Sequence, residues 1–171
     1  LHLLAQSSAP TQEEVLQQAY TNCPGLLTPP SELIEAIMST YADKLEGEHP
    51  SWQRRPKEEA SSRQHDLEQM QHLLQKIAER LGYSMQCQAK IITWQDENQH
   101  LVYSFFPSLT TIISPFIASY QELPGQKYVL IPGSRSNLIS FKLRRDPHLQ
   151  ELCAENWHFI KFRQVRVLAA E

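Results

Sequence analysis

The stretch VLIPGSRSNLISFKLRRDPHLQE, residues 129–151, decides the predicted fold class. An apolar run meets a Pro-Gly pair, and a segment follows in which apolar residues mix with basic ones. We expect a short buried strand, a turn, and a helix capped by Ser134 or Ser136. The helix should end near Arg145, because a proline two residues later disfavours helical geometry in the residue before it. A strand that leads directly into a helix is typical of proteins that mix the two elements along the chain.

The residues on both sides of this stretch supply further elements. Apolar side chains in 67–81 recur at steps of three and four, which predicts one apolar face of a long helix. Residues 83–94 alternate apolar and polar side chains, and 101–106 follow after a polar turn, so these two segments should pair as a hairpin. Pro115 either kinks a helix over 108–121 or, with the serine before it, begins that helix. The expected helices are 11–20, 28–41, 61–80, 108–121, 136–145 and 148–155. The expected strands are 83–94, 101–106, 128–131 and 157–162. A loop with a buried Trp52 is expected over 45–60.

Helices alternate with strands in this order, which predicts an α/β protein: a central mixed β-sheet flanked by helices. Val165, Val167 and Leu168 should close its core. The 171 residues suit one domain with an extension. We therefore expect an N-terminal helical extension and loop over residues 1–60 and an α/β core domain over residues 61–171.

The composition, with 41% apolar and 20% charged residues, is that of a globular protein. No apolar run approaches the roughly 20 residues that span a bilayer, so we expect no membrane partner. The first residues, LHLLAQSSAP, lack the basic segment of a signal peptide. Cys23, Cys87 and Cys153 are isolated and odd in number, which argues against a disulfide framework and favours a reducing, cytoplasmic location.

Basic residues are concentrated in the C-terminal third of the chain. Residues 126–171 hold eight Lys or Arg and four Asp or Glu, a net charge of +4. The whole chain has a net charge of −3, so residues 1–125 carry −7. This asymmetry favours a local anionic partner. The alternative is that the two parts of the chain simply neutralise each other.

Six of the basic residues form the candidate nucleic-acid-binding surface. On a helical wheel Lys142 falls among the apolar residues of its helix, so its ammonium group must reach water along its own stem or bind an anion. The turn before this helix presents unbonded backbone amides, which bind anions well. Under the alternative interpretation, Lys142 extends past Phe141 and the arginines are only solvated. The expected contacts to a DNA or RNA backbone, without sequence readout, come from Arg135, Lys142, Arg144, Arg145, Lys161 and Arg163.

Aromatic residues alternate with basic ones in WHFIKFRQVR, residues 157–166. Such interleaving occurs in segments that stack nucleic-acid bases. We favour the alternative that Trp157, Phe159 and Phe162 belong to the core, because alternate aromatic residues of a strand are more often buried.

No catalytic or cofactor motif is present in the sequence. The turn before the predicted helix at 136–145 contains one glycine and no Gly-Lys-Ser/Thr, so it is not a nucleotide-binding P-loop. Ser134 does not lie in a Gly-x-Ser-x-Gly elbow, and nothing orients a histidine toward it. His65 and His72 are seven residues apart on a helix, too far to chelate one zinc ion. We expect no catalytic residue, no metal site and no cofactor.

The order of long helix, hairpin, helix, strand, helices and strand resembles the restriction-endonuclease-like (PD-(D/E)XK) fold over about residues 62–168. The segment IITWQDENQHLVYSFFPSLTTIISPFI, residues 91–117, is similar to segments of that class. In those segments, a strand that ends in Trp is followed by a turn, a strand with acidic residues and a Thr-rich helix start. The family holds a catalytic metal with an Asp on the first strand and Glu-x-Lys on the next.

The corresponding positions in this sequence lack the acids. The two segments read QAKIITW and YSFFPS, which contain no Asp or Glu, and Lys90 has no carboxylate partner in them. Asp96 and Glu97 lie in the turn between the segments, at the wrong end for a shared metal. The resemblance therefore implies a degenerate nuclease active site and a role in nucleic-acid binding or scaffolding.

Three functions follow from these observations. The first is a non-catalytic nucleic-acid-binding or assembly module. The second is a protein-interaction subunit of a larger complex, in which the acidic N-terminal helices dock on a partner and the basic surface pairs with acidic groups. The third is a metal-dependent nuclease with atypically placed acids, for which the candidates are Glu79, Asp96, Glu97 and Glu122.

Overall fold

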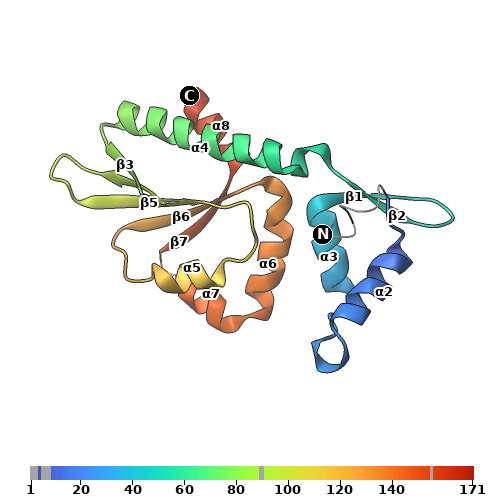
Figure 1. Cartoon of the computed structure of the whole chain (residues 1–171). Coiled ribbons are helices and arrows are strands. Elements are labelled where there is room, and N and C mark those ends of the chain that lie inside the picture. Colours follow the sequence, from blue (N-terminus) through green and yellow to red (C-terminus); the bar gives the residue numbers. More distant parts are fainter. Residues whose placement is uncertain (1–3, 5–8, 89–90, 155) are drawn as a thin grey trace. The chain divides into compact units, whose positions relative to one another are not determined.

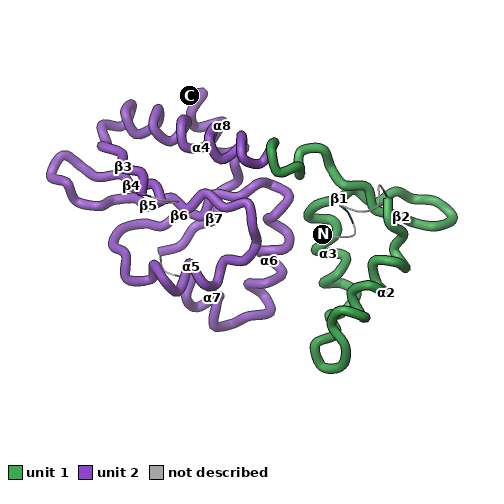
Figure 2. Tube along the Cα trace, in the orientation of Figure 1, with its two compact units in different colours: residues 1–62 green, residues 63–171 purple. Residues whose placement is uncertain are grey.

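The chain divides into two compact units, which are described separately (Figure 2). Residues 1–62 form the N-terminal unit and residues 63–171 the C-terminal unit. Lys90 and the last residue of the helix expected over 148–155 lie outside the described residues. The computed structural model describes residues 4, 9–88, 91–154 and 156–171.

The helices α2 (Gln12–Asn22) and α3 (Ser31–Tyr41) belong to the N-terminal unit. α2 begins with a capping box. The Thr11 hydroxyl accepts from the Glu14 amide at 3.2 Å, and the Glu14 carboxylate accepts from the Thr11 amide at 2.8 Å. Pro30 lies directly before α3, where its fixed backbone angle suits the start of a helix.

The loop expected over residues 45–60 is in part a β-hairpin. β1 (Ala42–Leu45) pairs antiparallel with β2 (Ser51–Arg54). These strands are too short and too highly charged to show the alternation by which strands are recognised. Trp52 is 3% exposed, which confirms the burial expected for it. The other buried residues of this core are Leu4, Val15, Ile34, Met38 and Ala42.

A five-stranded sheet in the order β3-β4-β5-β6-β7 forms the centre of the C-terminal unit (Figure 1). β3 (Ser84–Gln88), β4 (Ile91–Gln95) and β5 (Leu101–Pro107) are antiparallel neighbours. β6 (Gln126–Ile131) pairs parallel with β5, and β7 (Trp157–Lys161) pairs parallel with β6. This arrangement confirms the predicted α/β class with a central mixed sheet. The single strand expected over 83–94 is wrong, because the hairpin β3–β4 takes its place.

Helices cover both faces of this sheet (Figure 1). α4 (Ala60–Leu81) and α8 (Phe162–Ala170) pack on one face. α5 (Ser114–Ser119), α6 (Ser136–Arg145) and α7 (Pro147–Cys153) pack on the other. The helix α5 between β5 and β6, and the helices α6 and α7 between β6 and β7, are in the crossovers that parallel strands require.

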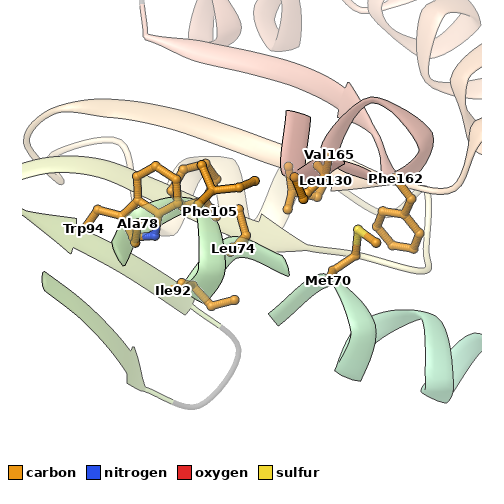
Figure 3. Close-up of a cluster of buried hydrophobic side chains, with 11 residues drawn as sticks. Met70, Leu74, Ala78, Ile92, Trp94, Phe105, Leu130, Phe162 and Val165 are labelled. Carbon is orange, nitrogen blue, oxygen red and sulfur yellow. The ribbon is translucent and has the colours of Figure 1, made fainter. Parts of the chain in front are cut away.

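The core between α4 and the sheet uses the apolar face that the spacing in 67–81 predicts. Met70 and Leu74 of α4 are buried together with Phe162 and Val165 of α8. Figure 3 shows Met70 and Phe162 next to each other, with Leu74 closer to the sheet. Burial of this stripe is the main source of stability for a surface helix of this kind.

The helix α8 differs from the expectation of a strand to residue 162 followed by core residues. Phe162, Val165 and Ala169 are buried at helical spacing. Val167 is 59% exposed and Leu168 is 46% exposed, so these two residues do not close the core. The alternation typical of a strand ends at residue 161, and steps of three and four residues replace it.

The start of α6 also differs from the expectation. Neither predicted serine caps this helix, because the 3₁₀ turn Gly133–Arg135 leads into it directly. Ser136 is its first residue, and the Ser136 hydroxyl donates to the Gly133 carbonyl at 2.9 Å. α6 ends at Arg145, as predicted. α5 begins at Ser114 with proline in its first turn, the second of the two alternatives considered.

Candidate nucleic-acid surface

Arg135 lies in the turn between β6 and α6, where the sequence predicts a phosphate contact. Its side chain is buried, and its Nε donates to the Leu109 carbonyl at 2.9 Å and its Nη1 to the Ser134 hydroxyl at 3.1 Å. A guanidinium held in this way does not reach a phosphate at the surface. The expectation for Arg135 is therefore corrected: it fastens the loop between β5 and α5 to the start of α6.

Lys142 points inward from α6, as the helical wheel predicts. Its Nζ donates to the Thr111 carbonyl at 2.7 Å, and burial lowers the pKa of its ammonium group below the usual value of 10.5. The sequence predicts that the Lys142 ammonium group reaches water or binds an anion. In the structure it binds the Thr111 carbonyl instead. Since Thr111 and Leu109 belong to the same loop, Lys142 and Arg135 hold one segment from two sides.

Asp66 of α4 binds two arginines. Its Oδ2 lies 2.7 Å from Nη1 of Arg63, and its Oδ1 lies 2.6 Å from Nη2 of Arg166. Arg166 also donates from Nε to Gln69 at 2.9 Å. Because Arg166 belongs to α8, these bonds connect the two helices on this face of the sheet. Four basic side chains are thus bonded within the unit, and they are the tied cations: Arg63, Arg135, Lys142 and Arg166.

Four other basic residues form two pairs. Arg144 and Arg145, in the last turn of α6, are the α6 pair, and Lys161 and Arg163, at the junction of β7 and α8, are the α8 pair. Three of the four are exposed, and Lys161 is half-buried. Within the described part of the chain, no carboxylate lies at ion-pair distance from any of them. The guanidinium of Arg145 lies 5.5 Å from the ring centre of Phe141.

The fold places Arg163 and the α6 pair in different layers. α6 belongs to the helical layer on one face of the sheet, and α8 belongs to the layer on the opposite face (Figure 1). The 10 residues of α6 also carry its end about 15 Å from the carboxyl end of β6. The six residues predicted to contact a phosphate backbone thus comprise the α6 pair, the α8 pair and two tied cations.

The aromatic residues near the α8 pair belong to the core. Trp157 and Phe162 are buried, and Phe159 is half-buried. The Trp157 ring lies 4.9 Å from that of Phe106, and its Nε1 donates to Gln121 at 3.2 Å. This packing agrees with the interpretation favoured from the sequence, and the rings of Trp157 and Phe162 are not exposed for base stacking.

The acids considered for a metal-dependent nuclease occupy separate places. Asp96, in the turn between β4 and β5, accepts from the His100 amide and from a second amide at 2.9 Å each, and these bonds lower the pKa of its carboxyl group. Glu79 lies on α4, and Glu97 and Glu122 are exposed on turns. Neither β4 nor β5 carries an acid. Among the residues that the structure describes, no three His, Cys, Asp or Glu side chains are grouped to hold a metal.

Lys127 is a basic residue whose position the sequence analysis did not predict. On β6 it is 1% exposed, its Nζ lies 5.8 Å from the Trp157 ring centre, and no described carboxylate pairs with it. The Ser104 hydroxyl, at the paired position on β5, is buried without a hydrogen-bond partner among the described residues. A signal existed: Lys127 shares strand parity with Val129 and Ile131, so all three point to one face.

Comparison with protein-family models and with curated proteins gave no match. Within the described ranges, no helix is both long enough and apolar enough to cross a membrane. The candidate surface consists of the α6 pair and the α8 pair. The tied cations of the same unit bind groups within the fold.

Proposed function

We propose that the C-terminal unit is a non-catalytic nucleic-acid-binding or assembly module with a restriction-endonuclease-like core. The observation that carries this proposal is the contrast between the tied cations and the α6 and α8 pairs, which have no described carboxylate partner. The chain order of α4, three antiparallel strands, α5, β6, two helices and β7 supports the resemblance over residues 62–168.

An unpaired arginine or lysine at the surface binds a phosphate without first losing an internal partner. Each such contact releases condensed counterions from the nucleic acid, which makes binding strong at low salt and insensitive to sequence. Arg163 belongs to α8, whereas the side chain of Lys161 lies on the face of the sheet that α6 covers, because Lys161 pairs with Ile131 of β6. The absence of acids from β4 and β5 supports binding without cleavage.

The proposal is tested by fluorescence anisotropy with labelled duplex and single-stranded DNA of about 20 nucleotides, in about 50 mM salt. The variants are Arg144→Gln with Arg145→Gln, and Lys161→Gln with Arg163→Gln. We expect each double variant to weaken binding by about 3- to 30-fold, because each removes two phosphate contacts. Mg²⁺ is included, and the length of the labelled strand is measured afterwards.

The matched control is Lys57→Gln with Lys76→Gln, which also removes two exposed lysines but leaves both pairs intact. It should bind within about twofold of the wild type, since a change in net charge alone has a small effect at this salt concentration. Absence of binding by the wild type, or equal losses in all three variants, would overturn the phosphate contacts. A shortened strand would overturn the non-catalytic assignment and point back to the nuclease.

One observation favours a protein-interaction role for the N-terminal unit as a second candidate function. Leu26 and Leu27, in a 3₁₀ turn after α2, are fully and largely exposed, and Tyr20 of α2 is also exposed. Adjacent exposed leucines are typical of surfaces that another protein covers. A photo-crosslinking residue at position 27 should give a discrete adduct in cells that Leu26→Asp removes. No adduct, or one unaffected by Leu26→Asp, would exclude this role for the turn.

A further inference from the structure

β3 lies at the edge of the five-stranded sheet, and β4 is its only neighbour among the strands that the structure describes (Figure 1). Four of its five residues are exposed, and Met85 is half-buried. The outer side of an edge strand presents backbone N–H and C=O groups that can pair with another strand. The strand therefore has the geometry of an interaction edge.

The chemistry of this edge lacks the usual features that prevent strand pairing. β3 has the sequence SMQCQ, without a charged residue or a proline. Natural edge strands commonly carry lysine, proline or a bulge that blocks addition of a further strand. The opposite edge strand, β7, differs because it contains the exposed His158 and ends in Lys161. Of the two edges of this sheet, β3 is the one that carries no charge.

A hollow of about 370 Å³ accompanies the edge, between β3 and α4. Met85 and Cys87 line it from the strand, and Ala78 and Glu79 line it from the helix. Leu81, at the end of α4, is 56% exposed. An added strand would place alternate side chains over this hollow and cover apolar surface that now faces water.

We propose that a second copy of this chain pairs antiparallel with β3, across a two-fold axis at Gln86. This register sets Met85 opposite Cys87 of the second copy and Ser84 opposite Gln88 of the second copy. A two-fold interface requires a surface that is complementary to itself, and this edge meets the requirement because no like charges are opposed. The two hollows then lie on the same side of a continuous sheet.

The interface predicts a weak dimer. Pairing of two five-residue strands buries less than the roughly 1,200 Å² of a stable interface, even when the residues around the hollow are added. We therefore expect dissociation in the micromolar range, with dimer appearing as concentration rises. The proposal does not depend on nucleic-acid binding, because β3 belongs to neither exposed pair.

The test is sedimentation velocity of the full chain from about 5 to 500 µM. The key variant is Gln86→Lys, which sets two like charges against each other at the axis and should weaken dimerisation at least about tenfold. Gln86→Asn is the matched control and should dimerise like the wild type. Unchanged melting temperatures in both variants show that the fold is retained, as expected for an exposed position.

A second measurement locates the contact. A short bis-maleimide should link Cys87 of two copies, since diagonal side chains across an antiparallel pair lie about 7 to 8 Å apart. Cys87→Ser should abolish the linked dimer, whereas Cys23→Ser should not. A wild type that stays monomeric throughout the concentration range would overturn the proposal. A dimer that survives Gln86→Lys unchanged would also overturn it, because another surface would then form the contact.

Discussion

The tied cations and the exposed pairs of the C-terminal unit are chemically alike but used differently. Arg135 and Lys142 donate to carbonyl groups of one loop, and Asp66, which also binds Arg63 within α4, joins α4 to α8 through Arg166. The α6 and α8 pairs make no such contacts with described carboxylates. A segment rich in Lys and Arg therefore does not predict a basic surface, because some of its side chains bind groups inside the fold. The two sets should also respond differently to substitution.

The largest expected effect separates the two sets by stability. Arg135→Met should lower the free energy of unfolding by about 3 kcal/mol, because the Leu109 carbonyl loses its donor in a buried site. Arg144→Met, at an exposed position in α6, should change it by less than about 0.5 kcal/mol. Urea denaturation measures both values. Equal effects for the two variants would remove the distinction between tied and exposed residues.

The next effect concerns Asp66. Asp66→Asn should destabilise the unit by about 1 to 2 kcal/mol, because Arg63 and Arg166 both lose a charged partner in a partly buried site. Glu68→Gln is a suitable control, since Glu68 is exposed and, among the described residues, accepts only from Gln64. If thermal and urea unfolding show the same stability for Asp66→Asn and the control, the bridge between α4 and α8 contributes nothing measurable.

Lys127 sharpens the comparison, since it is buried without a described carboxylate partner. Lys127→Met keeps the length of the side chain and removes the free-energy cost of burying an ammonium group. We expect this cost to be larger than the stabilisation from the 5.8 Å contact with the Trp157 ring. We expect a gain of about 1 kcal/mol in the free energy of unfolding. A loss of similar size would show that the ammonium group has a stabilising role of its own.

The smallest effect is the pH dependence that Lys142 contributes. Its pKa in the folded protein lies below the usual 10.5, because burial disfavours the charged form. Below the folded value both states bind the proton, and there is no effect. Between the folded value and about 10.5 the unfolded chain binds more protons, so this residue makes stability rise with pH. Lys142→Met should lack that rise.

The measurement for Lys142 is urea unfolding of wild type and variant in steps from pH 8 to 10.5, the range that ends at the ordinary lysine value. The difference in the free energy of unfolding between the two proteins separates the contribution of Lys142 from that of Tyr128. Burial raises the pKa of Tyr128, which has the opposite sign and is common to both proteins. A constant difference across the range would contradict the assignment.

Much of the fold of the C-terminal unit was predictable from local patterns. The three–four spacing in α4, the apolar run of β6 and the proline that ends α6 each act through neighbours in sequence. The helix α8 was missed because its apolar residues follow a strand of similar composition without a break. The hairpin β1–β2 was missed because its strands depend on pairing with each other rather than on alternation.

The candidate site was less predictable than the fold. A helical wheel shows that Lys142 points inward, but its partner is Thr111, 31 residues earlier in the chain. Arg135 meets Leu109 across 26 residues, and Arg166 meets Asp66 across 100. Such contacts depend on tertiary structure, and spacing along the sequence carries no trace of them. The sequence shows that Arg144, Arg145, Lys161 and Arg163 are basic, but not which of them the chain leaves without an internal partner.

The central claim, that the exposed pairs carry phosphate binding, is tested most directly by the salt dependence of duplex binding. The wild type is compared with a variant in which Arg144, Arg145, Lys161 and Arg163 are all replaced by Gln. The account predicts that the logarithmic slope against salt becomes shallower by about two to four, with an unchanged melting temperature. An identical slope in the two proteins would contradict it.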